Sequence, residues 1–175
     1  MLFWDIKWKD FEDDISGLEL SQRTNIALAS LENVLIKGIE YFKFSLNKEQ
    51  KKLIIKSLDI LWGKGTQDPD VAEKIKEQLE MDHKPGVYDL MTAILVLLNS
   101  FKKLNADDTL DVLSYIYQSV LDREIISQLE KDTLESEIQV KERNNPVCLQ
   151  VIDDQLRFLE EIKNGKLIER QDVQL

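Results

Sequence analysis

The sequence predicts an all-α fold: a single-domain bundle (1–175) of about seven or eight helices around a central apolar helix at about 88–101. Apolar residues recur every three or four positions along most of the chain, which is the spacing of one helix face. The 3 prolines and 6 glycines fall mostly between these segments, where helices end. A chain of 175 residues with 43% hydrophobic residues has the size and composition of one domain with a real core.

The first predicted helix carries an aromatic stripe. Its apolar residues are spaced by four, three, four and three positions, so they share one side of a helix. We expect this stripe to face the core; the alternative is an exposed interface anchor. The residues are Trp4, Trp8, Phe11, Ile15 and Leu18.

The next two helices have recognisable ends. Ser21 is the expected cap of a helix that runs to about Ile39 and is ended by the aromatic patch 41–44. Asn47 is the expected cap of a third helix. This helix stops at 63–65, where two glycines accept left-handed dihedrals.

The fourth and fifth helices differ in apolar content. Asp68 and Pro69 open the fourth, 69–81, which is weakly apolar and is therefore expected on the surface. The fifth, at about 88–101, is apolar on every side, so other helices must surround it. A buried strand is the alternative for this run, but leucine, methionine and alanine favour a helix, and no second run resembles a partner strand.

The chain then offers one clear helix and one ambiguous segment. A sixth helix starts at Asn105 or at Asp107 and ends near Ser127. The segment 131–143 has seven charged residues among thirteen, which predicts either an exposed helix or a mobile connection.

The last helix opens at 144–146 and closes at 164–165. The tail 166–175 has little to bury, and we expect it to fray. The predicted core seam of the last helix is Leu149, Ile152, Leu156 and Leu159.

The sequence indicates a cytoplasmic protein. Residues 1–7 lack the basic lead and uncharged apolar run of a secretory signal. The most apolar stretch, 90–98, is nine residues long, short of the ~20 needed to cross a bilayer. Cys148 is the only cysteine, which excludes an intramolecular disulfide and suits a reducing compartment.

The sequence carries no recognisable catalytic motif. His83 is the only histidine, so a zinc or di-iron centre lacks its clustered ligands, and we predict neither a metal nor a cofactor. A Cys–His pair would need Cys148, which lies beside a core seam, where a free thiol behaves as a small hydrophobe. We therefore expect no catalytic residues and no enzyme.

Acidic residues dominate the charge. The 23 basic and 33 acidic residues give a net charge of −10, which disfavours binding to nucleic acid or to an anionic membrane. Residues 1–87 have 13 basic and 16 acidic residues, net −3, whereas 88–175 have 10 and 17, net −7. Carboxylates of this kind are solvated helix faces and caps, or they form an acidic patch for a basic partner. The candidate partner-binding residues are Asp107, Asp108, Asp111, Asp153 and Asp154.

Several short stretches lie in a consistent order over most of the chain: Ile26–Glu32, Ile60–Trp62, Gly86–Ala93, Asn145-Pro146 and Gln155. Together they resemble the YjaG-like bacterial proteins. The resemblance implies an all-helical fold and relatives among the immunity proteins of polymorphic toxin systems, which bind and neutralise a cognate toxin in the producing cell. It implies no catalytic residues.

The expected function is therefore a non-catalytic binding protein, most specifically a cytoplasmic immunity protein with a toxin domain, such as a basic nuclease, as its partner. An acidic inhibitor would be steered to the cleft in which such a toxin holds its polyanionic substrate. The alternative is a helical scaffold or adaptor with another partner, including a homodimer. A third alternative, an enzyme that uses the carboxylates, predicts a deep pocket with two convergent acids of perturbed pKa.

Overall fold

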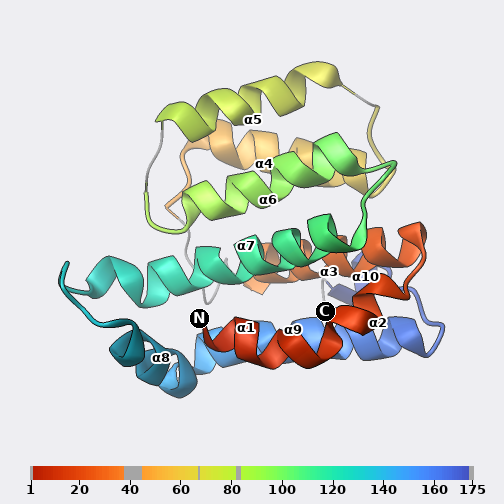
Figure 1. Cartoon of the computed structure of the whole chain (residues 1–175). Coiled ribbons are helices and arrows are strands. Elements are labelled where there is room, and N and C mark those ends of the chain that lie inside the picture. Colours follow the sequence, from red (N-terminus) through yellow and green to blue (C-terminus); the bar gives the residue numbers. More distant parts are fainter. Residues whose placement is uncertain (1, 38–44, 67, 82–83, 174–175) are drawn as a thin grey trace.

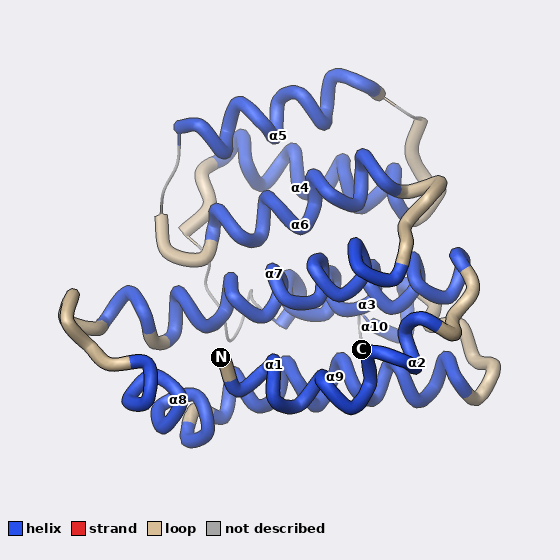
Figure 2. Tube along the Cα trace, in the orientation of Figure 1, coloured by secondary structure: helices blue, strands red, loops and turns tan. Residues whose placement is uncertain are grey.

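The computed structural model describes residues 2–37, 45–66, 68–81 and 84–173 and confirms the all-α prediction (Figure 2). Every regular element in these ranges is a helix, and the seven from α3 to α9 have ten residues or more. The elements are α1 (Phe3–Trp8), η1 (Lys9–Phe11), α2 (Glu12–Ser16), α3 (Leu20–Lys37), α4 (Lys48–Leu61), α5 (Pro69–Met81), α6 (Val87–Ser100), α7 (Ala106–Glu124), η3 (Ile126–Gln128), α8 (Glu135–Asn144), α9 (Pro146–Lys163) and α10 (Arg170–Val173).

The helices form two layers joined by α7 (Figure 1). One layer contains α4, α5 and α6, and the other contains α1, α2 and α9. Helix α7 packs against α6 of the first layer, α9 of the second, and α3 beside it. Because both layers bury apolar side chains against it, α7 holds the bundle together.

The apolar helix α6 is largely buried, as predicted, but it is not surrounded on every side. It packs against α7, α5, α4 and α3. Leu90, Ile94 and Leu97 have no exposed surface, and each such burial contributes roughly 1.5–3 kcal/mol. Leu95 and Val96 are half-buried, so one side of α6 reaches the surface and α7 is the helix that touches both layers.

The N-terminal aromatic stripe faces the core, but not on one continuous helix. A 3₁₀ turn, η1, separates α1 from α2, and Phe11 leaves helical geometry at φ −114°, ψ 0°. Trp4 stacks on Trp8 at 5.6 Å between ring centroids, and Phe11 meets Trp8 edge-on at 6.1 Å. Trp4, Trp8 and Ile15 are buried, whereas Phe11 is half-buried.

Side-chain caps set several helix starts. The Asn47 Oδ1 accepts from the Gln50 N–H at 2.8 Å, and the Gln50 Oε1 accepts from the Asn47 N–H at 2.9 Å, so α4 starts as predicted. By contrast, α3 starts at Leu20, which places Ser21 inside the helix and makes the predicted cap wrong. The predicted end of that helix, including Ile39 and 41–44, lies outside the described residues.

Helix α5 runs from Pro69 to Met81, as predicted, and lies at the outer edge of its layer (Figure 1). Only Val71 and Ile75 are buried on it. Asp68 caps its first turn by accepting from the Asp70 N–H at 3.0 Å.

The structure decides both points that the sequence left open, the first residue of the sixth helix and the structure of the segment 131–143. Asn105 caps α7, because its Oδ1 accepts from the Asp108 N–H at 2.7 Å. The charged segment forms α8, an exposed helix that contacts α9 and α1. Its one buried residue is Glu142, whereas Val140 is 59% exposed.

The core seam of α9 is shifted relative to the prediction. Leu149 and Leu156 are only half-buried, although Ile152 and Leu159 are buried as expected. The seam differs from the predicted one because the polar side chain of Gln155 is on the buried side of the helix. The buried side of α9 comprises Cys148, Val151, Ile152, Asp154, Gln155, Phe158, Leu159 and Ile162.

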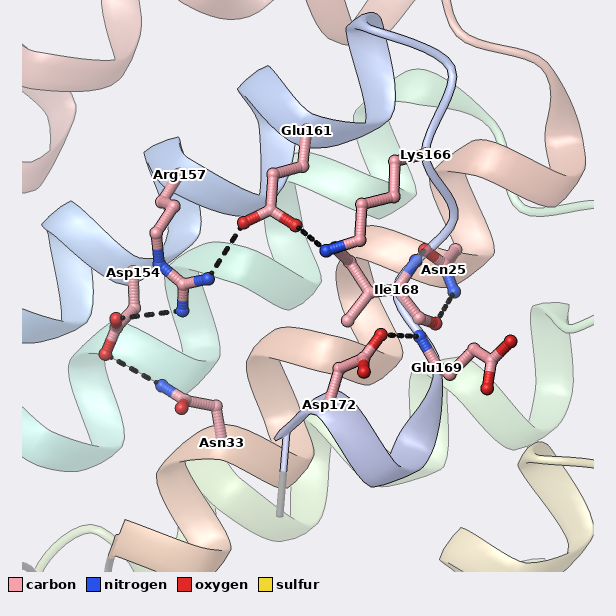
Figure 3. A network of polar contacts seen from close by, with 9 residues as sticks. All are labelled: Asn25, Asn33, Asp154, Arg157, Glu161, Lys166, Ile168, Glu169 and Asp172. Carbon is pink, nitrogen blue, oxygen red and sulfur yellow. Dashed lines mark hydrogen bonds and ion pairs between the residues drawn. The ribbon is translucent and has the colours of Figure 1, made fainter. Parts of the chain in front are cut away.

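The prediction of a frayed tail is wrong. Ile168 is 2% exposed, and Asn25 of α3 bonds its backbone twice at 2.8 Å, donating to the carbonyl and accepting from the N–H (Figure 3). Arg170 donates to Glu32 of α3 at 2.8 Å and to Asp59 of α4 at 2.6 Å. The tail docks because single residues in it, Ile168 and Arg170, contact α3 and α4, which lie far away in the sequence.

Candidate partner-binding surface

One side of α7 forms a continuous polar stripe. Its members recur every three or four residues, so they lie above one another on the helix. Asp107 and Asp111 are exposed, and the other three are half-buried. The stripe spans about 22 Å, at 1.5 Å per residue. Its members are Asp107, Asp111, Tyr115, Gln118 and Asp122, and we call them the α7 stripe.

The stripe is acidic at both ends. Asp107 and Asp111, one turn apart, have no basic partner among the described residues. Asp122, at the far end, accepts a 2.6 Å hydrogen bond from the Gly86 N–H at the start of α6. That bond fixes the position of the carboxylate.

Asp89 of α6 adds a second carboxyl beside Asp122. Burial, and then the negative charge of Asp122, raise the pKa of Asp89 to about 6. A half-buried carboxyl beside a like charge favours any arriving cation, because a cation would lower that pKa again. The surface is therefore electrostatically suited to a basic side chain.

Asp108 has a structural role. Its backbone N–H and its carboxylate both take part in the capping box with Asn105 at the first turn of α7. A carboxylate there is favoured by the helix dipole. Of the three predicted aspartates on α7, two therefore belong to the stripe and one caps the helix.

The two predicted aspartates on α9 do not join the stripe. The Gln155 Nε2 donates to the Leu113 carbonyl across antiparallel α7 and α9 at 3.0 Å, which sets the register of the two helices. In this register Asp153, which is exposed, lies near the level of Tyr115 along the axis, but on α9 and not on the stripe itself.

Asp154 is not a surface residue. It is 5% exposed, and its Oδ2 accepts from the Asn33 Nδ2 at 2.9 Å (Figure 3). Arg157 donates to its other oxygen at 3.3 Å and to Glu161 at 3.0 Å. This carboxylate joins α9 to α3, so the sequence placed it on the wrong face.

Cys148 has neighbours that suppress its reactivity. Burial, and then the charge of Glu142, raise the pKa of the thiol to about 12, so it stays protonated at neutral pH. The Tyr117 hydroxyl beside it donates to Glu142 at 2.7 Å, and burial raises the pKa of this phenol as well. His83, the proposed partner in a Cys–His pair, lies outside the described residues.

Sequence reasoning missed four residues of this surface. Tyr115, Gln118 and Asp122 lie on the same helical spacing as the predicted Asp107 and Asp111, so extending that period along α7 would have found them. Asp89 carries no such signal, because its place beside Asp122 depends on how α6 and α7 pack.

Two further features bear on function. Within the described ranges, no three histidine, cysteine, aspartate or glutamate side chains come together so as to hold a metal ion. No helix in the same ranges combines the length and apolar character needed to span a bilayer.

No family model, no curated protein and no solved structure matches the chain. The resemblance to the YjaG-like proteins therefore stays a prediction.

Proposed function

We propose that this chain is a non-catalytic binding protein that uses the α7 stripe to bind and neutralise a cognate bacterial toxin in the cytoplasm of the producing cell. The observation that carries the proposal is the placement of exposed Asp107 and Asp111, half-buried Tyr115 and fixed Asp122 on one side of a helix. The fitting partner is a basic one, such as the substrate cleft of a nuclease toxin.

The two kinds of residue in the stripe have separate tasks. Exposed, unpaired carboxylates such as Asp107 and Asp111 accelerate encounter with a basic surface, and salt weakens their effect. Tyr115 is half-buried and offers an amphipathic ring, the type of residue that sets residence time at interfaces. Acidity thus governs association, and the aromatic residue governs dissociation.

The position of α7 supports this use. It packs against α3, α6 and α9, so its backbone is held before any partner arrives. A surface on such a helix loses little conformational entropy on binding, which favours affinity.

The proposal is tested with the products of the neighbouring genes, among which it predicts a toxin. We expect the chain to co-purify with that toxin and to protect cells that express it. The double variant Asp107→Asn/Asp111→Asn should lower the association rate constant roughly tenfold at low salt, with much less effect at high salt, as measured by stopped flow. Tyr115→Ala should instead raise the dissociation rate.

Helix α5 provides a matched control. Glu73 and Glu77 are exposed carboxylates one turn apart, and Glu73→Gln/Glu77→Gln removes the same charge from another surface. Equal slowing by both double variants would show that only net charge matters and would refute the stripe. No binding and no protection would refute the toxin-neutralising function.

A scaffold or homodimer remains the second candidate because the layer of α4, α5 and α6 exposes large apolar side chains. Ile55 is 60% exposed, Met81 69% and Tyr88 49%. Sedimentation of the isolated chain separates the two candidates: a stable dimer that Ile55→Asp/Met81→Asp converts to monomer supports the second one.

A further inference from the structure

Two adjoining hollows open where α3, α4, α5 and α6 meet, away from the Asp122 end of the α7 stripe. The first has a volume of about 680 Å³ and the second about 490 Å³. Leu61, Phe101 and Lys102 line both, so the hollows are neighbours. Each volume lies within the usual range of small-molecule sites.

The ends of two helices create this space. Helix α4 stops at Leu61, and Gly63 then turns the chain at φ +72°. Gly65 lies so close to the α4 backbone that a Cβ would come within 3.2 Å of the Ile60 nitrogen, so the loop is held tightly against the helix end. Helix α6 stops at Ser100, and its following turn carries the chain to α7. The hollows lie between these ends.

Their lining is apolar below and cationic at the rim. Trp62, Leu98 and Phe101 are half-buried aromatic and aliphatic residues of the lining. Lys102 and Lys103 are exposed, and neither has an acidic partner within the part of the chain that the structure describes.

The carboxylate of the lining does not neutralise those lysines. Asp68 forms an ion pair with Lys56, and this hydrogen bond lowers the pKa of Asp68. Its other oxygen caps α5 through the Asp70 N–H. In a protein with a net charge of −10, the hollows thus have a locally positive rim.

Trp62 is a half-buried residue of the lining of the second hollow. Its ring adds apolar surface to that lining, and its fluorescence can report an occupant.

We propose that the two hollows bind a small carboxylate with an apolar tail, such as a medium-chain fatty acid. The tail lies against Phe101 and Leu98, and Lys102 and Lys103 attract the carboxylate. This combination of groups uses both the apolar lining and the unpaired ammonium groups. None of the lining residues belongs to the α7 stripe, so the site can fail while the proposed function stands.

The test titrates dodecanoate, below its micelle concentration, into the full chain. We expect saturable one-to-one binding by calorimetry, together with a change in tryptophan fluorescence that Trp62→Phe abolishes. Trp4 and Trp8 are buried elsewhere, so they should contribute little to this signal.

The variants decide which groups bind. Lys102→Gln/Lys103→Gln should weaken binding about tenfold, as expected for the loss of two exposed charge interactions. The matched pair Lys51→Gln/Lys52→Gln, two adjacent exposed lysines on α4, should leave binding unchanged. Ala72→Phe fills the first hollow and should abolish binding while both lysines remain. Melting curves establish that each variant is folded.

The charge of the head group separates specific binding from non-specific adsorption of the tail. Dodecyltrimethylammonium has the same tail with a positive head, and it should bind far more weakly than dodecanoate. Equal binding of the two probes, equal weakening by both lysine pairs, or no saturable binding of dodecanoate would overturn the proposal.

Discussion

At the scale of single residues, the surroundings of Asp89 disfavour the ionised form of its carboxyl. Its unfolded pKa is about 3.9, whereas burial and the charge of Asp122 raise its folded pKa to about 6. The native state therefore binds this proton more tightly than the unfolded state does. The ionised carboxylate costs stability above pH 6, and that cost disappears as the pH falls below about 4.

We therefore expect Asp89→Asn to stabilise the protein at neutral pH. The shift corresponds to at most about 3 kcal/mol, and partial exposure reduces the expected gain in the free energy of unfolding to about 1–2 kcal/mol at pH 7.5. At pH 4 the gain should be close to zero. Urea unfolding at both pH values measures this, with Asp153→Asn as an exposed control. A gain of equal size at both pH values would contradict the assignment.

The aspartates also show what a sequence can reveal about a site. Asp107 and Asp111 were predicted correctly as surface residues, because the apolar residues Val112, Leu113 and Ile116 mark a different side of α7 as the buried one. Asp154 was misplaced, although it lies three residues after Val151 and four before Phe158, on the buried side of the helix. Its partner Asn33 is 121 residues away, so no local pattern identifies this hydrogen bond.

At the scale of elements, local capping predicted the boundaries that depend on nearby residues. Asn47, Asn105 and the Asp68-Pro69 pair set the starts of α4, α7 and α5 through bonds within three residues. The break between α1 and α2 carries no glycine or proline. It was missed because the packing of Trp8 and Phe11 decides it.

Helix α1 is docked by a polar contact from outside itself. The carboxylate of fully buried Glu142 on α8 accepts from the Phe3 N–H, at the start of α1, at 3.3 Å. The Tyr117 hydroxyl on α7 donates to the same carboxylate at 2.7 Å. Glu142 thereby links three helices around the positive end of α1.

Tyr117→Phe should loosen this junction. It removes one donor from a buried carboxylate, which we expect to cost about 1–3 kcal/mol of the free energy of unfolding. Tyr115→Phe on the same helix, where the structure shows no hydrogen bond of the hydroxyl among the described residues, is the matched control and should cost less than about 0.5 kcal/mol. Urea unfolding followed by the fluorescence of Trp4 and Trp8 reports both. Equal losses would mean that the hydroxyl of Tyr117 contributes nothing specific.

At the scale of the whole molecule, the tail after α9 ties α3 to α4, a helix of the first layer. Arg170 contacts Glu32 on α3, whose side chain is 2% exposed, and Asp59 on α4, whose side chain is 44% exposed. The sequence predicted the helical class because periodicity is local. It missed this connection because a single arginine in a polar tail carries no periodic signal.

Arg170→Ala should therefore destabilise the whole protein. Removing one partner of a buried ion pair leaves the carboxylate of Glu32 with fewer donors, and we expect a loss of about 2–4 kcal/mol. Hydrogen exchange should also accelerate at the Ile168 amide, which Asn25 protects. Lys163→Ala, which breaks an exposed ion pair with Asp14, should have a much smaller effect on unfolding. A comparable effect of the two variants would show that Arg170 is an ordinary surface residue.

The position of Arg170 also bears on how the protein matures. The ribosome makes this residue after all the helices that it connects, so a nascent chain can form α3 and α4 well before the guanidinium exists to join them. Until Arg170 is made, the buried carboxylate of Glu32 lacks this donor, so the junction between α3 and α4 is completed only after both helices have been synthesised.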